Sequence, residues 1–338
     1  MPDYAHAVEL LRAGELVAFP TETVYGLGAD AANPQAVSRI FAVKNRPADH
    51  PLIVHLPDAD ALAPWARSIP PTARALAEAF WPGPLTLVLP RAPKVPDVVT
   101  GGQETVALRV PAHPVALELL RAFARSGGGR EGLCGIAAPS ANRFGQISPT
   151  RAEHVREEFG DAIPLVIDGG PCPVGIESTI VDLSRGEGIA PRILRLGALP
   201  LERIEALLGV RVELPDASLK SEAPRVPGSL AAHYAPRTPL TVIQASRLPE
   251  LCEKLTAEGK KIGVLFFSPI DAELRTNARF CLPDEPEAYA RALYDALRAL
   301  DAAGCDAILA ESVPDDSRWL AVADRLGRSG DRSQETDQ

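Results

Sequence analysis

The sequence has few of the residues that form disulfides, metal sites or membrane spans. Its 338 residues include five cysteines, which are widely spaced and form no Cys-x-x-Cys pair, so disulfides and a structural zinc site are not expected. No uncharged apolar run reaches 18 residues, which argues against a membrane-spanning helix. The first 15 residues carry acids where a secretory signal carries basic and then long apolar segments. We therefore expect a cytoplasmic protein with no membrane association.

Common catalytic and nucleotide-binding motifs are also missing. The sequence contains no G-x-x-x-x-G-K-[ST] loop, no H-E-x-x-H and no G-x-S-x-G, which leaves P-loop, metalloprotease and hydrolase functions without support. Gly26, Gly28 and Ala31 match the spacing of a dinucleotide fingerprint. They follow a polar stretch rather than a strand, so the match is weak evidence. The segment PTETVYGLGAD, which ends at Asp30, is rich in glycine and hydroxyl residues, and we predict that it is a loop leaving a strand end.

Positive charge is in deficit throughout the chain. The 35 Lys and Arg residues are outnumbered by 44 Asp and Glu, which gives a net charge of −9, and acids exceed bases both before and after residue 208. Binding to RNA in bulk requires several Lys or Arg contacts to phosphate. The composition argues against such a role and leaves a local basic pocket open.

Proline is abundant, with 33 residues beside 26 glycines, and this implies many turns and rigid loops. Short apolar runs such as PLIVHL, PLTLVLP, TVALRVP and STIVDL end in Pro, Gly, Ser or Asn or in a polar residue. Helical periodicity lies between them at 71–80, 114–125 and 150–159. We predict a mixed-sheet α/β domain over residues 1–208.

The pattern changes after this domain. Residues 209–239 fill with Pro, Ser and charge, which is typical of a linker. Strand and helix patterns alternate again over 240–330, with helices at 247–258 and 285–303, and predict a smaller parallel α/β domain. Residues 331–338 are predicted to be a disordered tail.

Polar residues gather at the predicted strand and helix ends. Lys44 and Arg46 lie just past a helical segment, and Ser140 and Asn142 follow the strand GIAA. Such groups suit phosphate binding, although a surface ion pair for the cations and helix capping near Ser148 are equally consistent with the pattern. Further polar residues occur on or beside strands, namely Thr23, His55, Arg109 and Ser178.

Taken together, these segments closely resemble the Sua5/YrdC/YwlC family in its long two-domain Sua5 form. The matching segments are PTETVYGLG, KNRP, PLIVH, WPGPLT, ALRVP, PSAN followed by SPT, STIVD, ILRLG, PGSLAAHYAP and LYDALRALD. The resemblance implies a twisted mixed-sheet YrdC-like domain, a linker that folds over the active site and a Rossmann-like parallel Sua5 domain.

The resemblance also implies an activity. Such enzymes form threonylcarbamoyl-AMP and pyrophosphate from L-threonine, bicarbonate and ATP, for N6-threonylcarbamoyladenosine at position 37 of tRNA. The product passes to the tRNA threonylcarbamoyl-transferase machinery, and a weak contact with tRNA is conceivable. Magnesium would arrive on the ATP phosphates, near Asn142, with no dedicated protein site and no organic cofactor.

The family's site residues carry over to matching positions. The catalytic group would be Lys44, Arg46, Ser140 and Asn142. The L-threonine pocket would contain Thr23, His55, Arg109, Ala138 and Ser178. ATP contacts would come from Arg46, His50, Thr105, Ser140, Ser148, Arg192 and the linker residue Tyr234.

Two alternatives stay open at this point. One is a carbamoyltransferase of the hydrogenase-maturation type, which shares a YrdC-like domain but also carries paired Cys-x-x-Cys zinc fingers that this sequence lacks. The other is a non-catalytic RNA-binding or ribosome-associated protein, against which the acidic charge argues.

Overall fold

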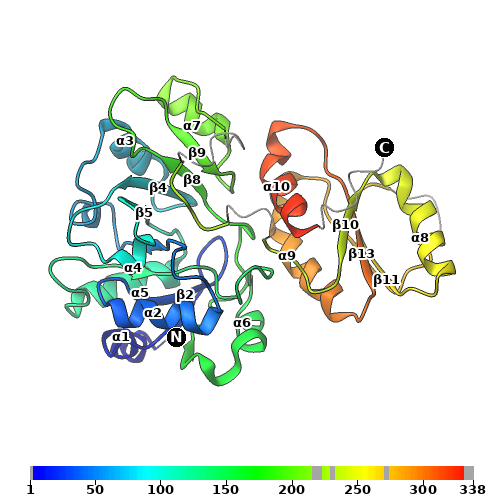
Figure 1. Cartoon of the computed structure of the whole chain (residues 1–338), viewed down its shortest axis with the longest axis horizontal. Helices are drawn as coiled ribbons and strands as arrows, with labels where there is room; N and C mark the ends of the chain where they lie inside the picture. Colours follow the sequence, from blue (N-terminus) through cyan, green and yellow to red (C-terminus); the bar gives the residue numbers. More distant parts are fainter. Residues whose placement is uncertain (1–2, 215–222, 229–232, 270–273, 331–338) are drawn as a thin grey trace. The chain divides into compact units, whose positions relative to one another are not determined.

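A mixed sheet and a parallel sheet organise the chain in a computed structural model that describes residues 3–214, 223–228, 233–269 and 274–330 (Figure 1). The chain divides into two compact units, and residues 145–148 belong to the second unit although they lie within the sequence of the first. The predicted tail 331–338 and much of the predicted linker lie outside the described residues. A mixed sheet followed by a parallel one confirms the predicted fold class.

The first unit is built on a nine-stranded sheet in the described residues, with the order β7-β1-β2-β6-β3-β5-β4-β8-β9. Its strands are β1 Val17–Phe19, β2 Gly26–Asp30, β3 Ile53–His55, β4 Leu85–Pro90, β5 Thr105–Arg109, β6 Ile136–Ala137, β7 Leu165–Val166, β8 Thr179–Asp182 and β9 Arg192–Arg195. Its helices are α1 Tyr4–Arg12, α2 Pro34–Lys44, α3 Pro71–Phe80, α4 Asp97–Thr100, α5 Pro114–Arg125, α6 Ala152–Phe159 and α7 Leu201–Leu208. Strands β3 and β5 pair in parallel, whereas β4 and β5 pair antiparallel.

Apolar layers cover both faces of this sheet. Along β1, Val17 and Phe19 join a buried cluster with helices α1 and α5, whereas Ala18 joins the large cluster that includes residues of α2 and α3. This follows from the alternation of side chains along a strand. His55 and Arg109 lie at the ends of their strands, where these apolar layers stop.

Strand β2 corrects one expectation. The stretch through Asp30 was expected to be a loop because it is rich in glycine and hydroxyl residues, yet Gly26–Asp30 pairs with both β1 and β6. A Cβ on Gly28 would lie 2.7 Å from the ring of Phe19 and 2.8 Å from Ile136. The glycines therefore allow close packing inside a strand, and the dinucleotide-fingerprint interpretation is wrong.

The second unit contains a four-stranded parallel sheet in its described part, in the order β10-β13-β11-β12. The strands are β10 Leu240–Ile243, β11 Ile262–Phe266, β12 Ala278–Cys281 and β13 Ala307–Glu311, with helices α8 Leu248–Ala257, α9 Pro286–Ala302 and α10 Leu320–Ser329. Backbone pairing with Ala235 and a hydrogen bond from Arg298 to the Ile147 carbonyl attach residues 145–148 to this unit. None of the helices in the described residues combines the length and apolar content needed to cross a bilayer.

Candidate active site

The loop between β1 and β2 holds its hydroxyl groups rigidly. The Thr21 hydroxyl donates to the carbonyl of Val24 at 2.6 Å and lies 2.8 Å from the hydroxyl of Thr23. All three residues are buried. The loop therefore presents Thr23 from a fixed local turn rather than from a mobile segment.

Arg109, at the end of β5, brings the predicted threonine-pocket residues together. Its Nε donates to the Gly83 carbonyl at 3.2 Å, and its Nη1 donates to the Thr23 hydroxyl at 3.1 Å. In the parallel pairing of β3 and β5, Arg109 is the partner of His55. Three predicted residues from three separate segments thus form one buried cluster.

His55 is a neutral group in this cluster. Burial, followed by the positive charge of Arg109, lowers the pKa of His55 to about 3. Its Nδ1 atom is buried and makes no hydrogen bond within the described part of the chain. A neutral imidazole with an open nitrogen can exchange a hydrogen bond with a ligand hydroxyl.

Ser178 and Ala138 are connected to the backbone segments that carry this cluster. The Ser178 hydroxyl lies 2.8 Å from that of Thr86, and Arg195 donates to it at 3.0 Å. The next residue, Thr179, donates its backbone N–H to the carbonyl of Pro84. Pro84 directly follows Gly83, whose carbonyl accepts the hydrogen bond from Arg109. Ala138 donates its N–H to the Ile53 carbonyl at the start of β3.

The two predicted cations, Lys44 and Arg46, lie at and just after the end of helix α2. This helix begins with an Asn33 side-chain cap and Pro34, and it ends where Asn45 adopts a left-handed φ of 51°. The turn at Asn45 separates Lys44, in the last helical turn, from Arg46 in the loop. Lys44 and Arg46 are both buried, so the surface ion-pair interpretation is wrong.

Lys44 joins the two predicted phosphate-binding segments. Its ammonium donates to the Ser140 carbonyl at 2.7 Å and also to the carbonyl of Asn142. Burial, followed by the neighbouring charge of Arg46, places the pKa of Lys44 well below its usual range. Within the described residues no carboxylate lies at ion-pair distance from this ammonium, so a bound anion would stabilise its charged form.

Phe144 links Arg46 with His50. The Arg46 guanidinium lies over the Phe144 ring at 5.5 Å, and the His50 ring meets the same ring edge-on at 5.1 Å. Burial and then the charge of Arg46 lower the pKa of His50. Arg46 also donates to the Pro51 carbonyl at 2.9 Å. The arrangement is a cation and an aromatic surface side by side, which suits a nucleotide.

The remaining predicted ATP contacts are more dispersed. Thr105 begins β5, and four residues of extended strand, about 13 Å, separate it from Arg109. Arg192, in β9, donates to the Glu213 carboxylate at 3.0 Å. Ser148 and Tyr234 belong to the second unit, where the Tyr234 ring stacks on Tyr294 with centroids 5.8 Å apart.

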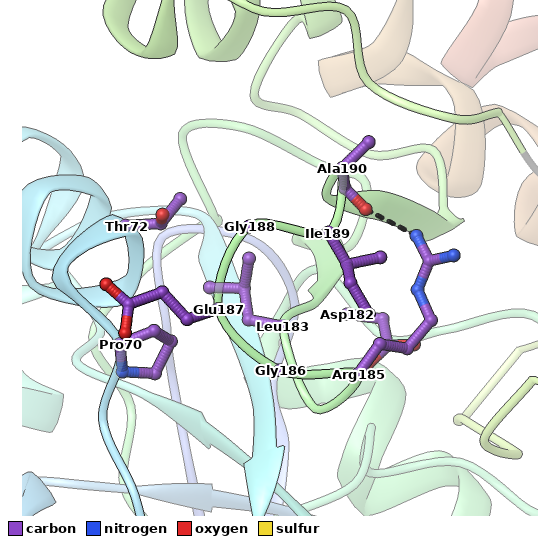
Figure 2. Close-up of a pocket in the computed structure, with 10 residues that line it drawn as sticks. All are labelled: Pro70, Thr72, Asp182, Leu183, Arg185, Gly186, Glu187, Gly188, Ile189 and Ala190. Carbon is purple, nitrogen blue, oxygen red and sulfur yellow. Dashed lines mark hydrogen bonds between the residues drawn. The ribbon is translucent and has the colours of Figure 1, made fainter.

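A separate small pocket lies elsewhere in the first unit. Figure 2 shows it between the β8–β9 loop and Pro70 and Thr72. Its volume of about 10 Å³ has room for about one water molecule. It is lined by none of the predicted site residues, and it is too small for an amino acid or a nucleotide.

Four site neighbours escaped the sequence analysis, namely Glu22, Thr86, Phe144 and Arg195. Only Glu22 had a visible signal, because it is an acid inside the otherwise uncharged PTET segment. Thr86 and Arg195 lie inside the matching segments WPGPLT and ILRLG but were given no role, and Phe144 lies between PSAN and SPT. Among the described residues no group of three or more His, Cys, Asp or Glu side chains is placed to hold a metal ion.

Comparison with known proteins identifies the relatives of this site. A family model that joins Sua5, YciO and YrdC, described as "Telomere recombination", matches residues 9–197. The chain belongs to this Sua5/YciO/YrdC family. A second model, described as "Threonylcarbamoyl-AMP synthase, C-terminal domain", matches residues 199–330, and the predicted resemblance is confirmed.

Several relatives named threonylcarbamoyl-AMP synthase are similar to this chain over nearly its whole length. The threonylcarbamoyl-AMP synthase of Pyrococcus abyssi is 45% identical over 330 residues, which cover 96% of this chain and 92% of that protein. The Bacillus subtilis protein of the same name is 42% identical over the same shares. A solved structure of P. abyssi Sua5 complexed with L-threonine matches with a TM-score of 0.87 and 44% identity, covering 96% of this chain and 94% of that one.

Proposed function

We propose that this chain is a threonylcarbamoyl-AMP synthase, which converts L-threonine, bicarbonate and ATP into threonylcarbamoyl-AMP and pyrophosphate. The observation that carries the proposal is similarity at 42–45% identity across both units to proteins of that name. The buried Arg109 cluster supports it from within the chain, because it provides charged and hydroxyl partners suited to a small amino acid.

In the threonine pocket, Arg109 binds the carboxylate. A guanidinium matches the geometry of a carboxylate and keeps its charge when buried. The hydroxyls of Thr23 and Ser178 and the open nitrogen of His55 provide hydrogen bonds for the polar groups of threonine, while Ala138 contributes an apolar contact. A pocket that bonds the substrate hydroxyl rejects valine strongly, whereas it rejects serine mainly through one missing methyl group, worth ~1–3 kcal/mol.

ATP, as its magnesium complex, binds beside Lys44 and Arg46. The ammonium neutralises triphosphate charge, and its bonds to the Ser140 and Asn142 carbonyls hold the two loops together. The Asn142 side chain lies near the magnesium carried by the phosphates. His50, Thr105, Ser148, Arg192 and Tyr234 complete the nucleotide contacts.

The reaction needs positioning more than a covalent nucleophile. The threonine amine and bicarbonate give a carbamate and water. One carbamate oxygen then attacks the α-phosphorus of ATP, the bond to the β-phosphate oxygen breaks, and pyrophosphate leaves. Charge neutralisation and alignment provide most of the catalysis in such a displacement.

The domain boundaries and cellular setting form part of the same proposal. Residues 1–208 form the catalytic domain, 209–239 a linker that folds over the site and 240–330 the C-terminal domain. The enzyme works in the cytoplasm and passes its product to the transferase that modifies position 37 of tRNA, with at most a weak tRNA contact of its own.

Pyrophosphate release from ATP tests this function. Release that requires both L-threonine and bicarbonate is the expected result. Release that is the same without threonine would contradict the proposal, and so would the absence of release with all three substrates. The assay also separates the enzyme from a non-catalytic RNA-binding protein, which would release none.

A further inference from the structure

Glu22 is a buried acid beside the candidate threonine pocket. The residue is only 5% exposed, and its Oε1 lies 2.6 Å from Nη2 of Arg109. Despite this short distance, neither the carboxylate oxygens of Glu22 nor Nη2 of Arg109 make a hydrogen bond in the part of the chain that the structure describes. Glu22 and Arg109 thus form a buried ion pair through Oε1, and Oε2 of Glu22 has no hydrogen-bond partner among the described residues.

The local structure fixes both groups in place. The Glu22 carbonyl accepts a hydrogen bond from the N–H of Val174 at 2.9 Å, so the backbone under the carboxylate is held. Arg109 is held by its bonds to Gly83 and Thr23. The ion pair with Arg109 compensates part of the cost of burying the carboxylate, and the second oxygen, Oε2, is left to accept from a ligand donor.

Apart from Arg109, the side chains near Glu22 leave its carboxylate without a hydrogen bond in the described residues. The Nδ1 of His113 accepts the N–H of Val115 at the start of α5, and burial lowers the pKa of His113, which favours the neutral ring. Burial, followed by the charge of Glu22, raises the pKa of the Cys172 thiol, which therefore stays protonated at neutral pH. Neither side chain forms a hydrogen bond to the Glu22 carboxylate.

Charge complementarity indicates the ligand group. Arg109 and Glu22 together have no net charge, as has a zwitterionic amino acid, which carries a carboxylate and an ammonium group on one carbon. The arginine suits the carboxylate, and the ammonium offers three donors to the acid. A ligand with a carboxylate alone would add an uncompensated negative charge to a buried site.

We infer that Glu22 binds the ammonium group of the amino acid substrate, so that the pocket selects a free α-amino acid over analogues without the amine. This inference rests on the proposed function, since it assigns threonine to the Arg109 cluster. It adds a specificity-determining residue to that site.

The test compares two ligands on two proteins by calorimetry. L-Threonine and 2,3-dihydroxybutanoate of matching configuration share the carboxylate and the side chain, and only threonine has the amine. In the unchanged protein we expect threonine to bind at least about 10-fold more tightly. Glu22→Gln, which keeps the shape and removes the charge, should weaken threonine about 10- to 100-fold and the amine-free analogue less than about 3-fold.

Three results would overturn the inference. Equal weakening of both ligands by Glu22→Gln would show that the acid acts only through Arg109. Unchanged threonine affinity would show that it does not act on the ligand. Equal affinity of the unchanged protein for both ligands would also contradict the inference. This last comparison needs no variant, so the inference can be tested even if Glu22→Gln fails to fold.

A control variant distinguishes loss of the Glu22 carboxylate charge from loss of a buried carboxylate charge elsewhere in the first unit. Asp30 is also a buried acid of the first unit, at the opposite end of β2 from the Glu22 loop, and its side chain accepts from the N–H of Ala32. Asp30→Asn should leave the affinity ratio unchanged. Pyrophosphate release, measured in parallel, tests the proposed function separately from the role of Glu22. A protein that binds threonine selectively but releases no pyrophosphate would contradict the function and would still support the role of Glu22.

Discussion

Two buried glutamates, one in each unit, differ in how their charge is satisfied. Glu311, 2% exposed at the end of β13, accepts backbone N–H groups of Phe267 at 2.8 Å and Ser268 at 3.0 Å and also the Ser268 hydroxyl. Glu22 is nearly as buried, accepts no hydrogen bond within the described residues and has the Arg109 guanidinium as its ion-pair partner. Glu311 connects the end of β13 to the residues that follow β11 through hydrogen bonds, whereas Glu22 is held by an ion pair beside the candidate site.

Buried cations show the same contrast. In the second unit, Arg325 pairs with the carboxylate of Asp324 and lies over the Tyr234 ring at 4.9 Å. In the first unit, Lys44 donates to neutral carbonyls alone. Lys44 is thus a buried cation without an ion-pair partner among the described residues, and such perturbed groups gather at functional sites.

The largest expected effect is on turnover. Lys44→Ala and Arg46→Ala should each lower threonine-dependent pyrophosphate release by at least about 100-fold, because each removes positive charge that stabilises the transferring phosphate. Circular dichroism should show a retained fold. The exposed Arg12→Ala is the matched control and should keep full activity. Activity in either variant like that of the unchanged protein would refute the assignment.

The next effect concerns stability in the second unit. Glu311→Leu leaves two backbone N–H groups and one hydroxyl without their acceptor and should lower the free energy of unfolding by about 3 kcal/mol. Urea denaturation measures this loss, and threonine affinity should stay within about 2-fold. If Glu22→Gln destabilised the protein more than Glu311→Leu, the comparison between the two acids would fail.

A pH effect follows from His55. Its folded pKa of about 3 lies below the ordinary value of 6.5, so the unfolded chain binds the extra proton between these values. Stability from this group is therefore complete above pH 6.5 and declines as the pH falls toward 3, by at most about 1.4 kcal/mol per pH unit. Urea denaturation at a series of pH values should show a shallower acid decline for His55→Gln, and an identical decline would contradict the buried neutral histidine.

The smallest effect is expected at an exposed pair of the second unit. Arg318 and Asp316 lie 2.9 Å apart on the surface. Solvent screening makes such pairs weak, so Arg318→Ala should leave both the thermal midpoint and turnover unchanged. A clear loss of either would show that burial is not what separates important charges from unimportant ones in this chain.

The sequence was sufficient for the elements with regular patterns. Helices at 71–80 and 114–125 match α3 and α5, because their apolar spacing and proline starts are local signals. Strand β2 was missed, because its glycines are explained by contacts with Phe19 and Ile136 that only the folded chain brings close. The transfer of residues 145–148 to the second unit is equally non-local.

For the candidate site, residue types were predictable and partners were not. The motifs identified Thr23, His55 and Arg109, and the structure brings them into one cluster. The acceptors of the Lys44 ammonium are two backbone carbonyls, and residue types in the sequence do not indicate which carbonyls a side chain will meet. Glu22 needed the distance to Arg109 before its chemistry became visible.

Mass spectrometry of the product formed from L-threonine, ATP and ¹³C-labelled bicarbonate tests the proposed reaction at its chemical step. The proposed reaction predicts threonylcarbamoyl-AMP that carries a single ¹³C atom, formed in equal amount to pyrophosphate and absent when threonine is omitted. An adenylate without the label, or pyrophosphate formed with no threonine-containing product, would contradict it.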